Sequence, residues 1–452
     1  MATANPNNNL QLSITNKQIL KLALPISFAI LVPQINFITN NIFLGGLGVD
    51  ELGAAGITGV YYLIFAAIGF GLNNGLQILI ARRAGENRPH EIGKIFTQGI
   101  LISLFIAAIG ILLTFFVAPS IYNSVLHEEK QKDMVIDFLK IRIWGLPFLY
   151  IYQMRNALLV GTNQSKYLVA GTIAETVANI FFDYGLIYGK FGMPELGFNG
   201  AAYASIIAEA TGMFVVFAVI HKKGISKQFA LFANLKYDKE VSFNILKRSS
   251  PLIFQHAISL ISWEFFYVLI EHHGARDLAI SNTMRNIFGF FGVFTWAFAA
   301  TTNTMVSNII GQGMEDKVTA LIKKIIRLSC GLSIIVFLLL NLFPGLFLSI
   351  YGQDEAFVEA AIPVMRVVSS ALVMMSFSVV WLNAVTGTGS TRINLLIEAI
   401  TITLYCLYVW VTLEKLNLPI VIGWMSEWVY WGSIFLLSYW YIRSDRWRGR
   451  KI

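Results

Sequence analysis

The class of fold follows from residues 94–118, which read KIFTQGILISLFIAAIGILLTFFVA. After Lys94 this segment holds no charged residue, and a membrane-spanning α-helix needs about 20 mainly apolar residues. Similar segments recur along the chain, which is 56% hydrophobic and 13% charged and has a mean hydropathy of +0.63. A soluble domain carries roughly a quarter charged residues, and the alternating segments of about 10 residues that are typical of a membrane β-barrel do not occur. The sequence therefore predicts an all-α membrane protein.

Apolar windows between charged residues, glycines and prolines predict about twelve transmembrane helices. The first six spans cover residues 17–44, 52–81, 94–118, 136–160, 166–189 and 198–220. The second six cover residues 244–270, 278–311, 320–348, 358–386, 393–413 and 418–442.

The positive charges orient these spans. Most of the 34 Lys and Arg residues lie at the N-terminus, in the loops after even-numbered spans and at the C-terminus. The opposite loops hold Lys130, Lys132, Lys190, Arg276 and Lys415. Since Lys and Arg are retained on the cytoplasmic side, we expect a multi-pass protein of the cell inner membrane with both termini in the cytoplasm. The net charge of +8 then belongs to these loops, and we expect membrane lipids and no nucleic acid as partners.

An internal repeat joins residues that are 226 positions apart. The matches include Pro25 with Pro251, Gly48 with Gly274, and Gly161 with Gly387. Proline and glycine constrain backbone geometry, so their recurrence at one offset indicates a structural repeat. Six spans per half is an even number, so both halves enter the membrane in the same sense. We therefore expect two six-helix lobes related by pseudo-two-fold symmetry about the membrane normal, with a cleft between them.

The chain is thus expected to have five parts. They are a disordered cytoplasmic N-terminus (1–16), a first lobe with spans 1–6 (17–220), a cytoplasmic linker (221–243), a second lobe with spans 7–12 (244–442) and a basic cytoplasmic tail (443–452). The Asn-rich start is expected to be disordered because it has little apolar surface to bury.

Acidic residues at membrane depth are the candidates for chemistry, because an ionisable group there is costly and needs a cavity or a partner. They are Glu175, Asp183, Glu209, Glu264, Glu398 and Glu427. Glu175, Asn179 and Asp183 are spaced i, i+4 and i+8, which predicts one polar stripe on a helix face. Such a stripe can bind a small cation, or a shielded carboxyl group can carry a proton. The alternative is a structural hydrogen-bond ladder to neighbouring helices.

Short motifs in order along nearly the whole chain resemble the multidrug and toxic compound extrusion (MATE) family of cation-coupled efflux transporters. They are Leu24-Pro25 and residues 43–48 (FLGGLG), 84–88 (AGENR), 159–163 (LVGTN), 179–183 (NIFFD), 196–205 (LGFNGAAYAS) and 387–392 (GTGSTR). The resemblance implies an antiporter that exports amphipathic organic compounds in exchange for H⁺ or Na⁺. It also implies a cation or proton site in the first lobe at Asp183 and Asn179. Glu175 joins this site on the stripe alone.

The sequence also departs from the family pattern. Asn40 stands where members often carry Asp on span 1, and we expect it to join the first-lobe cluster as a neutral ligand. Span 10 lacks the carboxylate of many members. Glu264 matches a position that is acidic in some members; it has either a coupling role or a structural pair with Arg285. Glu209 either completes the first-lobe site or pairs with Arg155.

Other functional classes are disfavoured. No P-loop motif occurs, and the six His residues show no spacing of metal ligands, so neither ATP hydrolysis nor a metal or cofactor site is expected. We expect a transporter rather than an enzyme, and one that works as a monomer. A flippase for a lipid-linked saccharide, from the same wider group of transporters, is the alternative, and Arg155 and Arg285 are the basic residues that would serve it.

Overall fold

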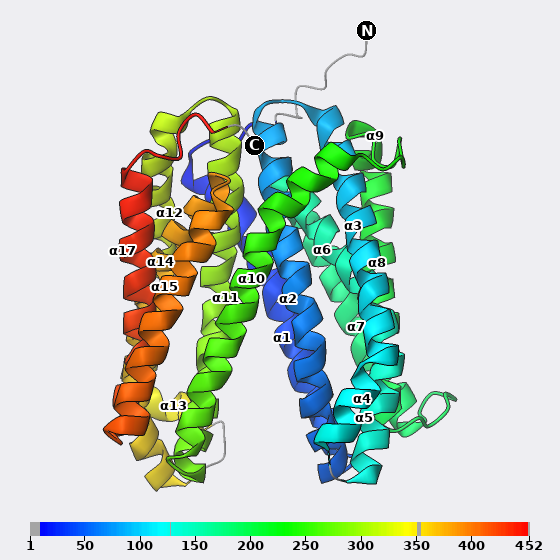
Figure 1. Ribbon diagram of the computed structural model, residues 1–452, viewed down its shortest axis with the longest axis vertical. Coiled ribbons are helices and arrows are strands. Elements are labelled where there is room, and N and C mark those ends of the chain that lie inside the picture. Colours follow the sequence, from blue (N-terminus) through cyan, green and yellow to red (C-terminus); the bar gives the residue numbers. More distant parts are fainter. Residues whose placement is uncertain (1–9, 127, 350–353, 451–452) are drawn as a thin grey trace. The chain divides into compact units, whose positions relative to one another are not determined.

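The computed structural model describes residues 10–126, 128–349 and 354–450. The described residues contain helices and connecting loops and no strand, which confirms the all-α prediction. Each of the twelve expected spans falls on one helix or on a run of consecutive helical segments. Their positions along the chain are shown in Figure 1.

The helices of the first half follow the six expected spans closely. They are α1 (Asn16–Gly45), α2 (Val49–Gly85), α3 (Pro89–Phe116), the short α4 (Ala118–Val125), α5 (Glu129–Arg142), α6 (Leu146–Gly161), α7 (Leu168–Tyr188) and α8 (Phe198–Lys222). The fourth expected span is formed by α5 and α6 together, and a 3₁₀ turn over Ile143–Gly145 joins these two helices. The linker carries the short α9 (Ile225–Gln228).

The second half repeats this order. Its helices are α10 (Lys239–Glu271), α11 (Ala275–Gly311), α12 (Val318–Leu342), α13 (Pro344–Ser349), α14 (Glu355–Gly387), α15 (Thr391–Val409), α16 (Ile420–Trp424) and α17 (Ser426–Arg443). A π-helical turn over Trp410–Lys415 extends α15.

Eight helices of the described part are long and apolar enough to cross a membrane. The other expected spans correspond to α1, the α5–α6 pair, α7 and α11. Of these, α7 carries two carboxylates and an amide, and α11 holds several Asn and Thr residues.

Contacts divide the chain into two compact units. One unit runs from Phe28 to Ile253, and the other takes in the described residues up to Ser27 together with those from Phe254 onward. Within the first of these, α7 packs along α8, and α6 packs against α2 and α3. Within the other, α14 packs against α11, α12 and α17, and α17 also contacts α15 (Figure 1). Helices α1 and α10 each begin in one unit and end in the other.

The N-terminal segment differs from its expected disorder in the part that the structure describes. Leu10 and Leu12 are buried, and the Leu12 N–H donates to Asn308 Oδ1 at 3.0 Å. Lys324 Nζ, on α12, donates to the Ile14 carbonyl at 3.0 Å. The two leucines supply the apolar surface that the Asn-rich composition seemed to lack. Residues 1–9 lie outside the described part.

The linker is anchored in a related way. The Gln98 side chain on α3 is buried, donates to the Lys236 carbonyl at 2.9 Å and accepts from the Asp238 N–H at 3.0 Å. Gln98 and Lys324 are 226 positions apart, so equivalent residues of the two halves hold the segments that precede α10 and α1.

Candidate functional site

The polar stripe lies on α7, as the spacing predicts. Asp183 is fully buried and Asn179 is 3% exposed, whereas Glu175 is half-buried. The helix ends at Gly189, whose φ of 64° is the left-handed conformation that terminates helices readily. Close packing against α8 shields the stripe, because a Cβ at Gly212 would lie 2.9 Å from the Glu175 Cβ. Glycine at this position therefore lets the two helices approach.

Asn40 lies near the end of α1 that contacts α7. The Tyr188 hydroxyl donates to the Phe43 carbonyl at 2.6 Å, and the Phe43 ring also contacts Tyr184. Asn40 precedes Phe43 by three residues, about 4.5 Å along the helix, and Asp183 precedes Tyr188 by five, about 7.5 Å. If α1 and α7 run in the same sense, as spans 1 and 5 should, Asn40 and Asp183 lie at similar depths. This is compatible with the expected cluster.

Glu209, on α8, pairs with Arg142 rather than with Arg155. The two guanidinium nitrogens of Arg142 donate to the two Glu209 oxygens at 3.0 and 2.5 Å, and both side chains are nearly buried. The Arg142 guanidinium also stacks on the Tyr62 ring, 3.8 Å from its centroid. Asp183 lies within electrostatic range of Arg142, so the pair borders the α7 stripe.

Arg155 is fully buried without an ion pair in the described structure. Its guanidinium donates to the Gly212 carbonyl at 3.3 Å and to Asn156 Oδ1 at 3.0 Å, and it stacks on Tyr152. Glu175 lies within electrostatic range of Arg142, Arg155 and Glu209. The first half therefore gathers three carboxylates and two guanidinium groups around α7.

The second half places Glu264 differently. Glu264 is exposed on α10, and no ion pair of the described residues joins it to Arg285. Arg285 instead lies over the Tyr267 ring, 5.0 Å from its centroid. The structural pair that we considered for Glu264 is therefore not formed.

Glu398 and Glu427 are both buried in the second half. Glu398, on α15, accepts hydrogen bonds from Ser259 and Gln255 on α10 and from Tyr430 on α17, so it ties three helices together. Glu427 accepts from the Trp431 indole at 3.0 Å within α17.

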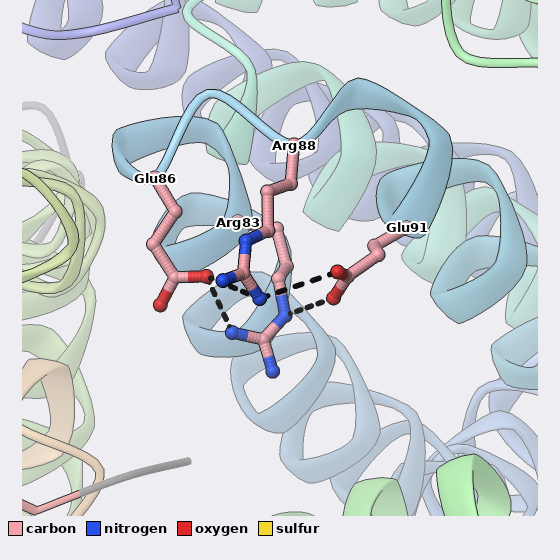
Figure 2. A network of polar contacts seen from close by, with 4 residues as sticks. All are labelled: Arg83, Glu86, Arg88 and Glu91. Carbon is pink, nitrogen blue, oxygen red and sulfur yellow. Dashed lines mark hydrogen bonds and ion pairs between the residues drawn. The ribbon is translucent and has the colours of Figure 1, made fainter.

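A network of charges closes the turn between α2 and α3, where the AGENR motif lies (Figure 2). Arg83 contacts Glu86 at 2.6 Å and Glu91 at 2.7 Å, and Arg88 reaches the same two carboxylates at 3.6 and 3.3 Å. The side chains of these residues are partly exposed, so the network stabilises the turn at the protein surface.

Both halves of the chain match the same protein-family model. The MatE family model matches residues 25–185 and again residues 251–411. These ranges cover more than half of the chain. The chain belongs to the MatE family. The two matches begin 226 residues apart, which confirms the internal repeat.

Curated relatives of this MatE chain are multidrug resistance proteins. It is 26% identical over 405 residues to the probable multidrug resistance protein NorM of Synechocystis sp.. The aligned region covers 85% of this chain and 84% of the relative. A solved structure of MATE in complex with MaL6 has a TM-score of 0.90 at 17% identity and covers 98% of this chain and 99% of that one. A MOP superfamily transporter from Pyrococcus furiosus has a TM-score of 0.88 at 16% identity, over the same shares.

Family membership makes this chain a multi-pass membrane transporter of a multidrug efflux family, with the twelve-helix fold of its structural neighbours. The sequence does not predict two features of the site, the partner of Glu209 and the partners of Glu398. Arg142 lies in a polar stretch at the start of the fourth span and was not recognised as the partner of Glu209. The neutral partners of Glu398 come from two other helices, and no local pattern links them.

Proposed function

We propose that this chain is a secondary active antiporter that exports amphipathic organic compounds in exchange for H⁺ or Na⁺ by alternating access. The observation that carries the proposal is the burial of Asp183 and Asn179 one turn apart on α7. Buried carboxylates at membrane depth are typical of ion pathways and proton relays. The multidrug resistance proteins among its relatives favour organic compounds as the cargo.

The charges around α7 favour cation binding. Glu209 engages Arg142 through two hydrogen bonds, so Asp183, Glu209 and Arg142 together carry a net negative charge when ionised. A cation that enters this cluster offsets that charge in a medium of low dielectric constant. Asp183 and Asn179 are the proposed ligands, with Glu175 and Asn40 as further members, and Glu264 is a further candidate for attracting a cationic substrate.

Binding must also move the protein between two states. Pro25 and Pro33 interrupt the hydrogen-bond ladder of α1 and allow it to bend. Because α1 ends against α7 at Phe43, a change at the α7 stripe can reach α1 through Tyr188. The driving force is sufficient, since moving one charge across the membrane supplies about 2.3 kcal/mol per 100 mV.

The placement in the cell follows from the same proposal. The protein lies in the inner membrane with both termini in the cytoplasm, surrounded by lipid, and acts as a monomer. The distribution of Lys and Arg among the loops supports this orientation.

The test uses purified protein in liposomes with imposed pH or Na⁺ gradients and ethidium as the organic cation. Wild-type protein should move ethidium only when a gradient is present. Asp183→Asn should abolish this coupled movement while the protein still inserts and keeps its unfolding transition. Asp50→Asn, at an exposed residue, is the matched control.

The possible outcomes separate the alternatives. Normal coupled transport by Asp183→Asn would refute the site. Ethidium movement by the wild type that is independent of both gradients would refute antiport. Movement of a lipid-linked saccharide without ethidium transport would favour a flippase.

A further inference from the structure

A second group of buried polar side chains lies in the other half of the chain. Glu398, Thr401 and Tyr405 are spaced i, i+3 and i+7, so they share one face of α15. Glu398 and Thr401 are fully buried and Tyr405 is 3% exposed. Ser426 and Glu427, at the start of α17, are also buried. We call these five residues and Tyr430 the α15–α17 polar column.

Glu398 is held by neutral groups. Ser259 Oγ lies 2.6 Å from Oε1, the Tyr430 hydroxyl contacts the same oxygen, and Gln255 Nε2 donates to Oε2 at 3.3 Å. No ion pair of the described residues includes Glu398 or Glu427. An ionised carboxylate that is buried without a cation is costly, so a proton or another cation is needed to neutralise it.

The hydrogens around Glu398 allow both of its protonation states. Ser259 Oγ also lies 2.9 Å from the Gln255 carbonyl, and a hydroxyl has one hydrogen to donate. When this hydrogen points to Glu398, the carboxylate is ionised and accepts. When it points to the Gln255 carbonyl, Ser259 Oγ can accept a hydrogen from a protonated Glu398. One hydroxyl rotation therefore accommodates the gain or loss of a proton.

The rest of the column has polar atoms with few partners. Thr401 Oγ1 is buried and makes no hydrogen bond within the described structure, and the Tyr405 hydroxyl and Ser426 Oγ interact with each other but have no further partner there. Buried polar groups are normally satisfied, and exceptions point to ordered water or an ion. Tyr430 lies within electrostatic range of both Glu398 and Glu427, and Tyr405 within range of Glu427. Thr401 lies between Glu398 and Tyr405 on the α15 face, and Tyr405 is within range of Glu427, so these side chains lead from one carboxyl group towards the other.

We propose that Glu398 is a second proton-binding site, in the second half of the chain, connected to Glu427 through the α15–α17 polar column and its water. This inference rests on the proposed antiport and adds a carboxyl group to a half whose span 10 lacks one. The partners favour H⁺ over Na⁺, because Gln255 presents an amide donor to Oε2 and a metal ion requires acceptor oxygens.

Among the residues that the structure describes, few titratable groups face this site. They are Tyr430 and Glu427 from α17 and Tyr405 from α15 itself, whereas α10 contributes the neutral Gln255 and Ser259 beside His256. A change in carboxyl protonation should therefore be assignable by single substitutions.

Infrared difference spectroscopy of the full chain in lipid tests the site without transport. Spectra are compared from about pH 5 to about pH 9, a range in which buried carboxyl groups titrate. The wild type should show the carbonyl stretch of a protonated carboxyl group that disappears at high pH. Glu398→Gln should lose one such band, Glu398→Asp should restore it at a shifted position, and Asp183→Asn should retain it.

Two further measurements make the test decisive. Tyr430→Phe removes one hydrogen bond without altering the carboxyl group and should shift the band's titration. A Glu398→Gln spectrum equal to the wild-type spectrum would overturn the proposal, as would an unshifted titration in Tyr430→Phe. In liposomes, failure of wild-type protein to couple ethidium efflux to a pH gradient would refute the antiport, whereas the infrared bands would still decide whether Glu398 binds a proton.

Discussion

Glu209→Gln removes one charge from the buried pair that borders the α7 stripe. Arg142 and Glu209 form two charge-assisted hydrogen bonds at 3.0 and 2.5 Å, with side chains only 12% and 10% exposed. Hydrogen bonds to charged groups contribute about 1.5–3 kcal/mol each, and breaking a buried pair by removing one partner costs about 3–5 kcal/mol. The stacking of Arg142 on Tyr62 remains after the substitution. We therefore expect the free energy of unfolding to fall by about 3 kcal/mol, the lower end of this range.

The substitution should also impair coupled transport, because the unpaired Arg142 is then free to neutralise Asp183, which lies within its electrostatic range. Denaturant unfolding of purified protein measures the first effect and ethidium efflux the second. A double-mutant cycle with Arg142→Met isolates the pair, and the double variant should recover part of the lost stability. Asp50→Asn is the control. Because the pair of Asp50 with Lys130 is exposed, this substitution should leave the free energy of unfolding unchanged.

A loss below about 1 kcal/mol, the value of an exposed pair, would refute the reasoning. So would additive effects in the cycle, because they would show that Arg142 and Glu209 do not depend on each other.

Other expectations concern the linker and the packing of α7. A hydrogen bond from Lys94 on α3, at 2.6 Å, holds the pKa of Asp238 in the linker below its ordinary value. The contact between the linker and α3 that this pair stabilises is therefore present at neutral pH and is lost as the pH falls below about 4. Hydrogen exchange in the linker, corrected for its intrinsic pH dependence, should then increase, and Asp238→Asn should remove this transition. Gly200→Ala should lower the free energy of unfolding by about 1–3 kcal/mol, because its Cβ would lie 2.6 Å from the Leu186 carbonyl oxygen. Gly59→Ala, where no atom lies within 4 Å, is the matched control, and an equal loss there would contradict the packing argument.

The sequence by itself determined the helical membrane class, the positions of the spans and the repeat of 226 residues. Each of these depends on local composition or on glycine and proline, whose effects act within a few residues. The stripe of Glu175, Asn179 and Asp183 could be predicted for the same reason, since helical periodicity alone places the three residues on one face. Burial of Asp183 was inferred from the cost of ionisable groups in a membrane, and the fold agrees.

The choice of partners was decided only by the tertiary structure. The sequence offered Arg155 as the basic partner of Glu209, but Arg142 forms the pair instead because α5 and α8 bring the two side chains together. Glu398 lacked any motif, yet α10 and α17 surround it with three neutral donors. The segment around Leu10 and Leu12 is held by hydrogen bonds to Asn308 and Lys324, which lie on distant helices. Such contacts join residues more than 30 positions apart, where helical periodicity carries no information. They determine which buried charges are neutralised and which remain available to bind an ion.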